Sequence, residues 1–401
     1  MISIGELFNK KEDCCGCELC TVVCVKGVLS MKPDEEGFLY PCIENAENCV
    51  DCKRCVNICP NKYSKRPYQE IKKGYGGHSN DESEVKSSSS GGLATIIGRY
   101  IIKNGGIVYG VRYSEDFHSA RYERAENEIE INRFRTSKYF QSKKGDVFQL
   151  VKKDLIDLKK VLFVGLNCEI SALYNYLGCC PDNLYTVSLV CHGVTSPLVH
   201  EQFCTDLENR YSSKISDFSV RYKVNGWKPY YIKASFINGN DYLKPFVSTD
   251  YEIAFKFLKR PSCSKCRFKI LNKDFGIKSD LVIGDYHGQK NTDSFYNKWG
   301  ASKFFSCTPK GEELIKAVDD LFYSEINIDK LRWSSPVLSI PTKKLLFHNI
   351  YSTAFKKNGL KNASNMAIIQ LSYKYIQPLI KKYHSIIRRV QVRLFNKVRI
   401  W

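Results

Sequence analysis

The sequence has no long apolar run. No stretch approaches the ~18 consecutive apolar residues that a membrane-spanning helix needs, and Met1 to Lys11 lacks the apolar core of a secretory signal. We therefore expect a cytoplasmic protein that does not span the bilayer. Three common signatures are also missing: a Walker A loop, a G-x-G-x-x-G strand–helix turn and a G-x-S-x-G elbow.

Acidic residues are missing from the C-terminal part of the chain. The formal net charge is +19, and Lys330 to Trp401 holds 15 Lys or Arg with no Asp or Glu. Within it, Pro378 to Trp401 has the pattern of a basic amphipathic helix. We expect this tail to bind an anionic membrane surface at the inner face of the membrane, or a partner subunit. Nucleic acid is disfavoured, because aromatic residues do not interleave as in a stacking platform.

Cysteine is abundant, at 18 residues, and eight of these fall into two runs near the N-terminus. Both runs read C-x2-C-x2-C-x3-C, and each cysteine of the second lies 35 residues after its counterpart. In this bacterial ferredoxin spacing, three close thiolates hold one [4Fe-4S] cluster and the fourth cysteine reaches the other cluster. We expect two such clusters, one on Cys14, Cys17, Cys20 and Cys59, the other on Cys49, Cys52, Cys55 and Cys24. Disulfides and zinc are the alternatives. Val25 stands where the first run would normally have proline.

A second group of cysteines follows predicted strands. Cys168 comes after the apolar run 160–164, Cys191 directly follows the run 184–190, and Cys263 and Cys266 form a C-x-x-C pair in a basic loop. Residues beyond the carboxyl ends of neighbouring strands converge on one edge of a doubly wound sheet. These four thiolates are therefore candidates for a third [4Fe-4S] cluster. The alternative is a small C-x-x-C site with two buried cysteines. We interpret Cys15, Cys42, Cys179, Cys180, Cys204 and Cys307 as structural.

The overall pattern predicts an α/β protein, α+β overall. Residues 1–65 form a ferredoxin-like two-cluster module, and the polar, glycine- and serine-containing segment 66–90 is interpreted as a linker. Helical periodicity (91–103, 144–159, 169–177, 196–209) then alternates with short apolar strands (107–111, 160–164, 184–190), which favours a partly parallel sheet. Residues 216–250 suggest antiparallel hairpins around Gly226 and Asn238-Gly239, and residues 329–401 a basic, partly helical tail.

Several segments together resemble a known family. They are Ser-Ser-Gly91-Gly92, Lys138-Tyr-Phe-Gln141-Ser142, Val161-Leu-Phe-Val-Gly165 leading to Cys168, Cys191-His-Gly-Val194, Asn225-Gly-Trp227, Arg260-Pro-Ser-Cys263-Ser-Lys-Cys266 and Gly284-Asp285-Tyr286. Over residues 10–325 the chain is similar to the beta subunits of coenzyme F420 hydrogenases and dehydrogenases. The resemblance implies an N-terminal family region at 91–143, a C-terminal family domain at 144–328, and FAD with iron–sulfur clusters.

The chain departs from the family pattern at two points. The usual Gly-Thr-Pro-Cys-Gln is here Gly165-Leu-Asn-Cys168-Glu169, and Gly-Asp-x-Trp-Gly is Gly284-Asp-Tyr-His-Gly288. These changes put the substrate in doubt, and F420 itself need not be the partner. The resemblance also extends to proteins of bacterial surface-polysaccharide gene sets.

Candidate residues for a flavin site follow from the helix that begins near residue 91. Ser90, Gly91 and Gly92 would leave backbone N–H groups open for a flavin diphosphate, although the pattern alone also fits a flexible linker with an ordinary cap. Lys138 and Gln141 would bond phosphate or the ring edge, and Asp285 a ribose hydroxyl or its own loop. His192 and His287 are the acid/base candidates, and hydrogen-bonded turn histidines are the alternative.

These patterns predict an iron–sulfur flavoprotein oxidoreductase. It would move electrons between [4Fe-4S] clusters and FAD, and would reduce or oxidise a small molecule. One alternative is a non-catalytic electron-transfer subunit that serves a partner enzyme. Another is a degenerate module that docks on membrane-bound glycan enzymes.

Overall fold

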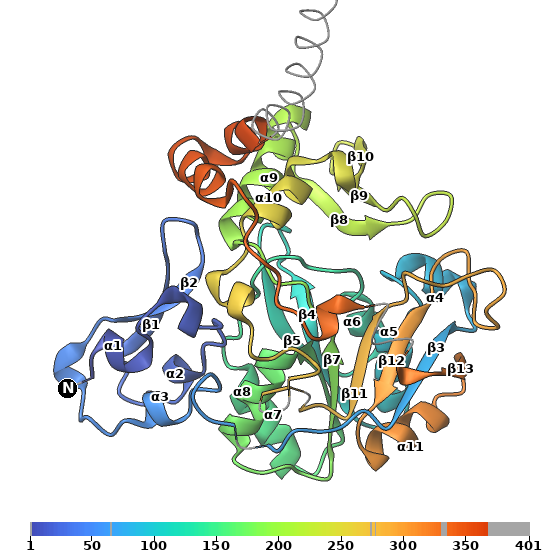
Figure 1. Ribbon diagram of the computed structural model, residues 1–401, viewed down its shortest axis with the longest axis horizontal. Helices are drawn as coiled ribbons and strands as arrows, with labels where there is room; N and C mark the ends of the chain where they lie inside the picture. Colours follow the sequence, from blue (N-terminus) through green and yellow to red (C-terminus); the bar gives the residue numbers. More distant parts are fainter. Residues whose placement is uncertain (1, 65, 273–274, 277, 330–334, 368–401) are drawn as a thin grey trace, which may run out of the picture.

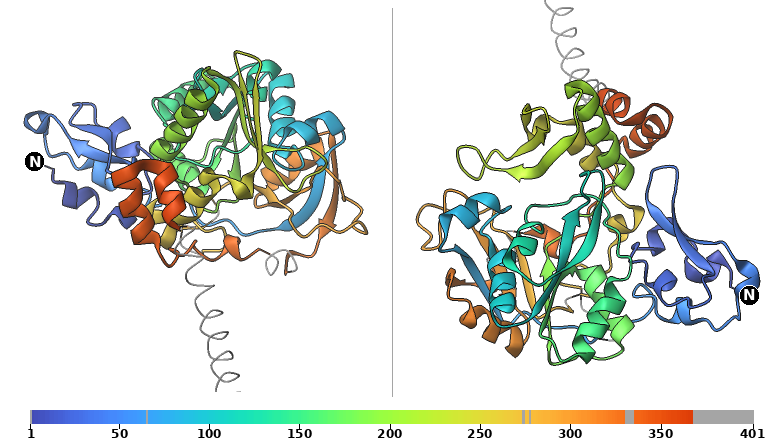
Figure 2. Two further views of the ribbon diagram at one scale, coloured as in Figure 1. Left: turned by 90° about the horizontal axis from the view of Figure 1, so that it is seen from above. Right: turned by 180° about the vertical axis from the view of Figure 1, so that it is seen from behind.

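The computed structural model describes residues 2–64, 66–272, 275–276, 278–329 and 335–367. An N-terminal module lies beside a larger body built on a mixed β-sheet (Figure 1). A second, smaller sheet and the C-terminal helices of the described part sit together at one end of this body (Figure 2). The predicted fold class, α/β and α+β overall, is confirmed.

The N-terminal module has little regular structure. Its strands β1 (Leu29–Pro33) and β2 (Leu39–Ile43) form an antiparallel hairpin. Its α-helices are α1 (Ile4–Leu7), α2 (Leu19–Val22) and α3 (Arg54–Asn57). Apolar residues of the module are buried in one cluster with residues of the larger body, so the module is packed against the body.

The main sheet of the described chain has eight strands in the order β13-β3-β12-β11-β7-β6-β4-β5. The strands β4, β6, β7 and β11 are parallel to one another, and the outer pairs are antiparallel. Their bounds are β3 (Lys73–Ser79), β4 (Ile107–Tyr113), β5 (Ala120–Ala125), β6 (Val161–Leu166), β7 (Leu184–Leu189), β11 (Leu281–Asp285), β12 (Ser302–Ser306) and β13 (Leu321–Ile326).

Helices cover both faces of this sheet because its strand residues alternate. In β6, Val161 and Phe163 pack against α7 (Val147–Ile156) and α8 (Asn167–Leu177). Leu162, between them, points to the opposite face with α5 (Leu93–Lys103), α6 (Glu128–Asn132) and α11 (Pro309–Ala317). The predicted helices at 91–103, 144–159 and 169–177 and strands at 107–111, 160–164 and 184–190 are present with shifted ends.

The interpretation of residues 66–90 as a linker is wrong. They contain β3, which pairs with β12 on one side and β13 on the other, and α4 (Glu82–Ser87). Glycine-rich β3 was missed because it lacks alternating apolar side chains. The glycines are required by close packing: a Cβ on Gly77 would lie 2.4 Å from the carbonyl oxygen of Phe322.

The predicted hairpins of residues 216–250 are confirmed. Strands β8 (Ile215–Tyr222), β9 (Tyr231–Phe236) and β10 (Asp241–Pro245) form an antiparallel sheet. The β9–β10 turn uses Gly239, whose φ is +83°. Helices α9 (Pro197–Tyr211) and α10 (Asp250–Phe257) pack on this small sheet.

The predicted tail is partly core. Residues 348–367 are helical, and Tyr351, Phe355 and Leu360 are buried among α9, α10 and the small sheet. Residues 368–401, which hold the proposed amphipathic helix, lie outside the described residues. Among the residues that are described, no helix has the length and apolar character to cross a bilayer.

Candidate iron–sulfur and cofactor site

The two N-terminal cysteine loops have the same backbone conformation. Glu18 and its counterpart Lys53, 35 residues later, both have a left-handed φ, at +65° and +55°, and so do Gly16 and Asp51. Each loop then leads into a short helix, α2 or α3. Non-glycine residues adopt this conformation rarely and at a cost. The sequence repeat is therefore a structural repeat.

Cys59 crosses from the second run to the first, as the ferredoxin spacing predicts. A small cavity is lined by Cys14, Cys17, Cys20 and Cys59, together with Cys15 and Cys55. Cys24 and Cys49 are half-buried, and Cys52 is exposed. The structure groups the four thiols of the first set around one cavity, and the ligation of iron by either set remains a prediction.

The third cysteine set (Cys168, Cys191, Cys263 and Cys266) lines one large cavity of about 920 Å³. Cys168 lies at the start of α8 after β6, and Cys191 follows the neighbouring parallel strand β7, so both reach the same edge of the sheet. Cys263 and Cys266 come from the 3-10 helix η4 (Pro261–Lys265) and its end. The structure therefore brings together all four residues of the proposed third cluster.

Without a metal, burial keeps these thiols protonated. Burial raises the pKa of Cys191 to about 11, and burial together with Cys191 raises that of Cys266 to about 11. Thiolates without a cation are thus disfavoured here, whereas iron would supply the compensating charge. In the described part of the chain, no three His, Cys, Asp or Glu side chains converge on one metal ion. A [4Fe-4S] cluster needs no such convergence, because each cysteine binds a different iron atom.

Two of the residues beside Cys168 that depart from the family pattern, Asn167 and Glu169, build a buried polar network. Asn167 donates to the carbonyl oxygens of Phe268 (2.9 Å) and Gly276 (2.7 Å). It thereby ties the start of α8 to the segment after the C-x-x-C pair. Glu169 pairs with Lys144 at 2.8 Å and accepts a hydrogen bond from Tyr122 at 2.6 Å. These residues hold Cys168 in place against its neighbours.

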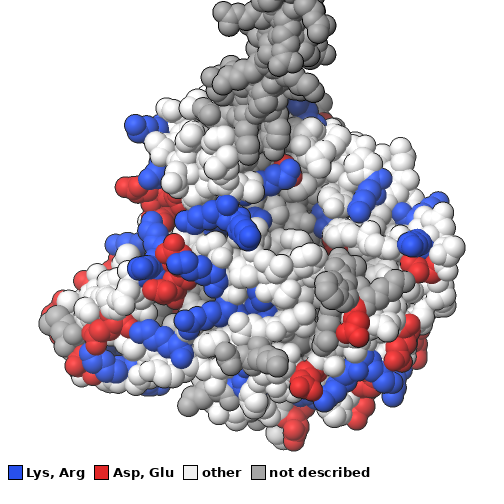
Figure 3. Space-filling view, viewed as in Figure 1, with Lys and Arg blue, Asp and Glu red and all other residues white. Residues whose placement is uncertain are grey.

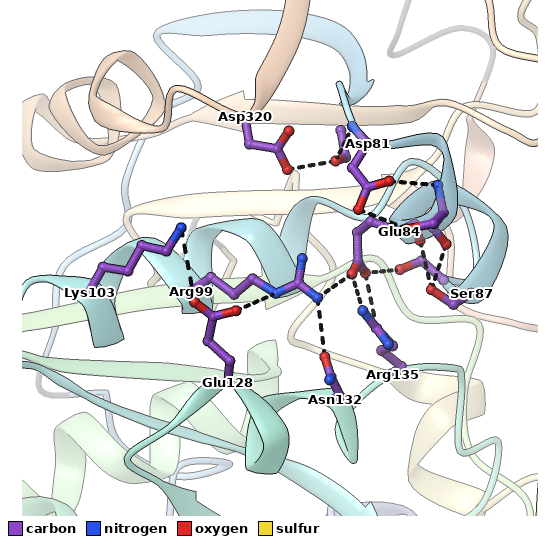
Figure 4. Close-up of polar contacts among 12 residues, drawn as sticks. Asp81, Glu84, Ser87, Arg99, Lys103, Glu128, Asn132, Arg135 and Asp320 are labelled. Carbon is purple, nitrogen blue, oxygen red and sulfur yellow. Dashed lines mark hydrogen bonds and ion pairs between the residues drawn. The ribbon is translucent and has the colours of Figure 1, made fainter.

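The serine loop before α5 is fixed by a buried carboxylate, Glu84 (Figure 4). Glu84 accepts from Ser88 (2.7 Å) and pairs with Arg99 (2.8 Å) and Arg135. The helix cap is Gly92, with φ at +84°, and the expected serine does not cap. Ser90 and Gly92 line the large cavity, whereas the Gly91 N–H donates to Ser302 Oγ at 3.1 Å.

Lys138 and Gln141 line the cavity, but both side chains are bonded to protein groups. Lys138 Nζ donates to backbone carbonyls at the end of α6, among them Arg135 at 2.6 Å, and burial lowers its pKa to about 7. The Gln141 amide donates to the Gly16 carbonyl (3.2 Å) and accepts from the Leu39 N–H (3.2 Å). Gln141 therefore fixes the N-terminal module, a role that its sequence position did not indicate.

Asp285 and His287 form a second polar group at the cavity. Asp285 ends β11 and pairs with buried Arg221 at 2.8 Å, and His287 Nε2 lies 3.5 Å from the same carboxylate. The His287 ring stacks on Trp227 with centroids 5.2 Å apart. Although desolvation would raise the pKa of Asp285, Arg221 and His287 lower it. Arg221 and Trp227 have roles that the sequence left open.

His192 also lines the large cavity. Desolvation, reinforced by Lys259 and Lys269, lowers its pKa to about 4. The imidazole is therefore neutral near pH 7. Its own backbone carbonyl accepts a hydrogen bond from Thr342 at 2.7 Å, which anchors the loop.

Arg260 is a site residue to which the sequence analysis assigned no role. It precedes the C-x-x-C pair and is 1% exposed. Its guanidinium donates to the carbonyl oxygens of Cys14 (2.9 Å) and Leu39 (3.0 Å) and to Gln141 Oε1 (2.8 Å). One side chain thus connects the loop of the third cysteine set to the first cysteine run.

The cysteines interpreted as structural differ in their exposure and contacts. Cys204 and Cys307 are buried, whereas Cys179 and Cys180 are exposed at the end of α8. Cys15 is the exception to the interpretation, because its thiol lies within hydrogen-bonding reach of both Cys17 and Cys168. Its adjacency to Cys14 was the one available signal.

Parts of this chain are similar to known proteins. Residues 158–330 match the family that describes the C-terminal part of the coenzyme F420 hydrogenase/dehydrogenase beta subunit. An uncharacterized ferredoxin of Methanocaldococcus jannaschii is 40% identical over 55 residues, which cover 14% of this chain and 69% of that protein. A chain of the F420-reducing [NiFe] hydrogenase complex from Methanosarcina barkeri aligns at 18% identity with a TM-score of 0.47, over 74% of this chain and 97% of that chain.

The protein is therefore an iron–sulfur protein of the oxidoreductase kind, in which a ferredoxin module is packed on a mixed α/β body. Residues 158–330 match the C-terminal part of the coenzyme F420 hydrogenase/dehydrogenase beta-subunit family, so the chain is beta-subunit-like, and it carries an N-terminal ferredoxin module. The family resemblance inferred from the sequence is confirmed.

Proposed function

We propose that this protein is an iron–sulfur flavoprotein that exchanges electrons between its clusters and a small molecule bound in the large cavity. The observation that carries the proposal is that the third cysteine set and the serine loop before α5 line one cavity of about 920 Å³. Iron–sulfur clusters supply single electrons, and FAD would convert these into two-electron chemistry on the substrate.

The residues that line the cavity favour an anionic ligand such as the FAD diphosphate. More Lys and Arg than Asp and Glu side chains line it, and Lys265 and Arg267 are also exposed. Lys and Arg side chains gather across the middle of the face seen in Figure 3. Opposite charges attract most strongly where water is excluded. Ser90 and Gly92 would contact the diphosphate, and Asp285 would face a hydroxyl-bearing part of the ligand.

Within this proposal, the histidines supply proton transfer. His192 lines the cavity in its neutral form, and His287 is positioned by Trp227 and Asp285. The His287 ring, backed by buried Trp227, would offer a flat surface on which a ligand ring can stack. The role we propose is in surface-polysaccharide biosynthesis, with F420 as one candidate ring ligand.

The test is iron, sulfide and flavin per chain after anaerobic purification. The proposal expects ~12 irons and one flavin, because each [4Fe-4S] cluster holds four irons. Cys168→Ser and Cys263→Ser should each lower the iron content to ~8, while Cys42→Ser, outside both cysteine sets, should leave it unchanged. About 8 irons in the wild type, and no flavin after reconstitution with FAD, would favour the non-catalytic electron-transfer subunit.

A further inference from the structure

One cysteine that belongs to none of the three proposed ligand sets lies between the small cavity of the ferredoxin module and the large cavity. Cys15 lines the small cavity together with Cys14, Cys17, Cys20 and Cys59. It also lines the large cavity, which the third cysteine set surrounds. Cys15 therefore lies in the wall between the site of the first cluster and the site of the third.

The Cys15 thiol bridges the two sets. It lies within hydrogen-bonding reach of Cys17 on one side and Cys168 on the other. Cys17 and Cys168 are ligand candidates for different clusters and come from different parts of the chain. Cys15, which lines both cavities, therefore lies between ligand candidates of the ferredoxin module and of the α/β body.

The surrounding structure holds this loop in one position. Gly16, next to Cys15, has φ at +71°, and a Cβ there would lie 2.5 Å from Gln141 Nε2 and 2.8 Å from Arg260 Cζ. The absence of a side chain lets Arg260 and Gln141 reach the loop backbone. On the other side, Glu18 accepts hydrogen bonds from the N–H groups of Lys144 (3.1 Å) and Gly145 (3.2 Å).

Ligation by Cys15 is not needed to complete either cluster. A [4Fe-4S] cluster takes four cysteines, and each cavity already has its four. The Cys15 thiol is therefore left to contact both ligand sets without belonging to either.

We propose that Cys15 is the electron-transfer bridge between the first N-terminal cluster and the third cluster. Electron tunnelling weakens exponentially with the gap between donor and acceptor, and contacting polarizable atoms such as sulfur narrow that gap. Each transfer would move one electron from one cluster to the other, and no bond would form or break at Cys15. An external reductant such as dithionite supplies the electron. This inference rests on the proposed function, because it requires the third cluster.

The experiment compares wild type with Cys15→Ala, Cys15→Ser and the control Cys42→Ala. Cys42 is a cysteine of the same module that lines neither cavity. Iron per chain is measured first. Transfer to the third cluster after a pulse of dithionite is then followed by freeze-quench EPR, and the magnetic splitting between reduced clusters reports their separation.

We expect Cys15→Ala to keep the wild-type iron content and magnetic splitting, with electron transfer to the third cluster at least about tenfold slower than in the wild type. Cys15→Ser, which keeps a hydroxyl in place of the thiol, should fall between Ala and wild type, and Cys42→Ala should match wild type. Loss of ~4 irons in both Cys15 variants would show that Cys15 is a ligand, and an unchanged rate would exclude the bridge. A changed splitting would show a structural role instead. Failure of the proposed function is recognised separately, by ~8 irons in the wild type.

Discussion

Buried cations are the most unusual single residues of this protein. Lys223 is 7% exposed, and its Nζ donates to the carbonyl oxygens of Val85 and Ser90. Desolvation, reinforced by neighbouring Arg221, lowers the pKa of Lys223 to about 7. Lys223 ties the serine loop to the small sheet, and it does so at an electrostatic cost that depends on pH.

The Lys223→Met variant tests that cost. Because the folded-state pKa lies below the ordinary value of about 10.4, the unfolded state binds more protons between about pH 7 and 10. Lys223 therefore makes the wild type gain stability as pH rises through this window. We expect the slope of unfolding free energy against pH, measured by urea titration, to be smaller in Lys223→Met. The exposed-lysine variant Lys244→Met should keep the wild-type slope, and equal slopes in all three proteins would contradict the pKa shift.

Helix α4 shows how a short element can position the serine loop. It has six residues, and its anchor is Glu84, which is fully buried and pairs with Arg99 of α5 and Arg135 beyond α6 (Figure 4). The same carboxylate holds Ser88 at the start of the serine loop. The position of the loop thus depends on a charge network among three elements.

Substitutions at two positions of α4 separate this network from ordinary surface pairing. Glu84→Gln removes the negative charge between two arginines and should lower the free energy of unfolding by about 3 kcal/mol. Glu82→Gln removes an exposed ion pair with Lys86, while the new amide oxygen can still accept from the Trp299 indole, so the loss should be much smaller than for Glu84→Gln. Urea unfolding measures both. Equal losses would mean that the buried network contributes no more than the exposed pair.

Across the whole molecule, the C-terminal segment closes the core. Tyr351 stacks on Phe257 of α10 with centroids 5.5 Å apart, and Phe355 is 2% exposed. The same segment contacts the N-terminal module, where Lys356 pairs with Glu35 at 3.1 Å. Residues 335–367 therefore belong to the folded body, in contrast to the expectation of a separate tail.

Two truncations test this division. A chain ending at residue 367 should keep the iron content and unfolding midpoint of the full chain. A chain ending at residue 344 exposes the surfaces covered by Tyr351, Phe355 and Leu360 and should lose on the order of 5 kcal/mol. Thermal unfolding followed by circular dichroism measures both, and similar midpoints for the two truncations would contradict the assignment of 345–367 to the core.

The truncation at residue 367 also tests the proposed role of the basic tail. The chain ending at 367 should lose flotation with vesicles that contain anionic lipid, because each Lys or Arg near such a surface contributes about 1 kcal/mol. The full chain should float with anionic vesicles and remain unbound to neutral ones. Equal flotation of both chains would instead favour docking of residues 368–401 on a partner subunit.

Elements built from local pattern could be predicted, and elements built from distant pairing could not. Apolar residues at helical spacing predicted α5, and the Asn238-Gly239 turn predicted the β9–β10 hairpin. Strand β3 was missed because glycine carries no apolar signal and its partners β12 and β13 lie more than 200 residues away along the chain.

The sequence by itself determined that this is an iron–sulfur protein of the oxidoreductase kind, because the spacing of cysteines in short loops is visible in the chain. It predicted twelve cysteine ligands, and the structure places the third set around one cavity. Only the tertiary structure decided what lies between the sites. Arg260 reaches Cys14 across 246 residues, Gln141 is used to hold the module, and Cys15 touches Cys168. Such contacts depend on how two folded surfaces pack, and no local spacing encodes that packing.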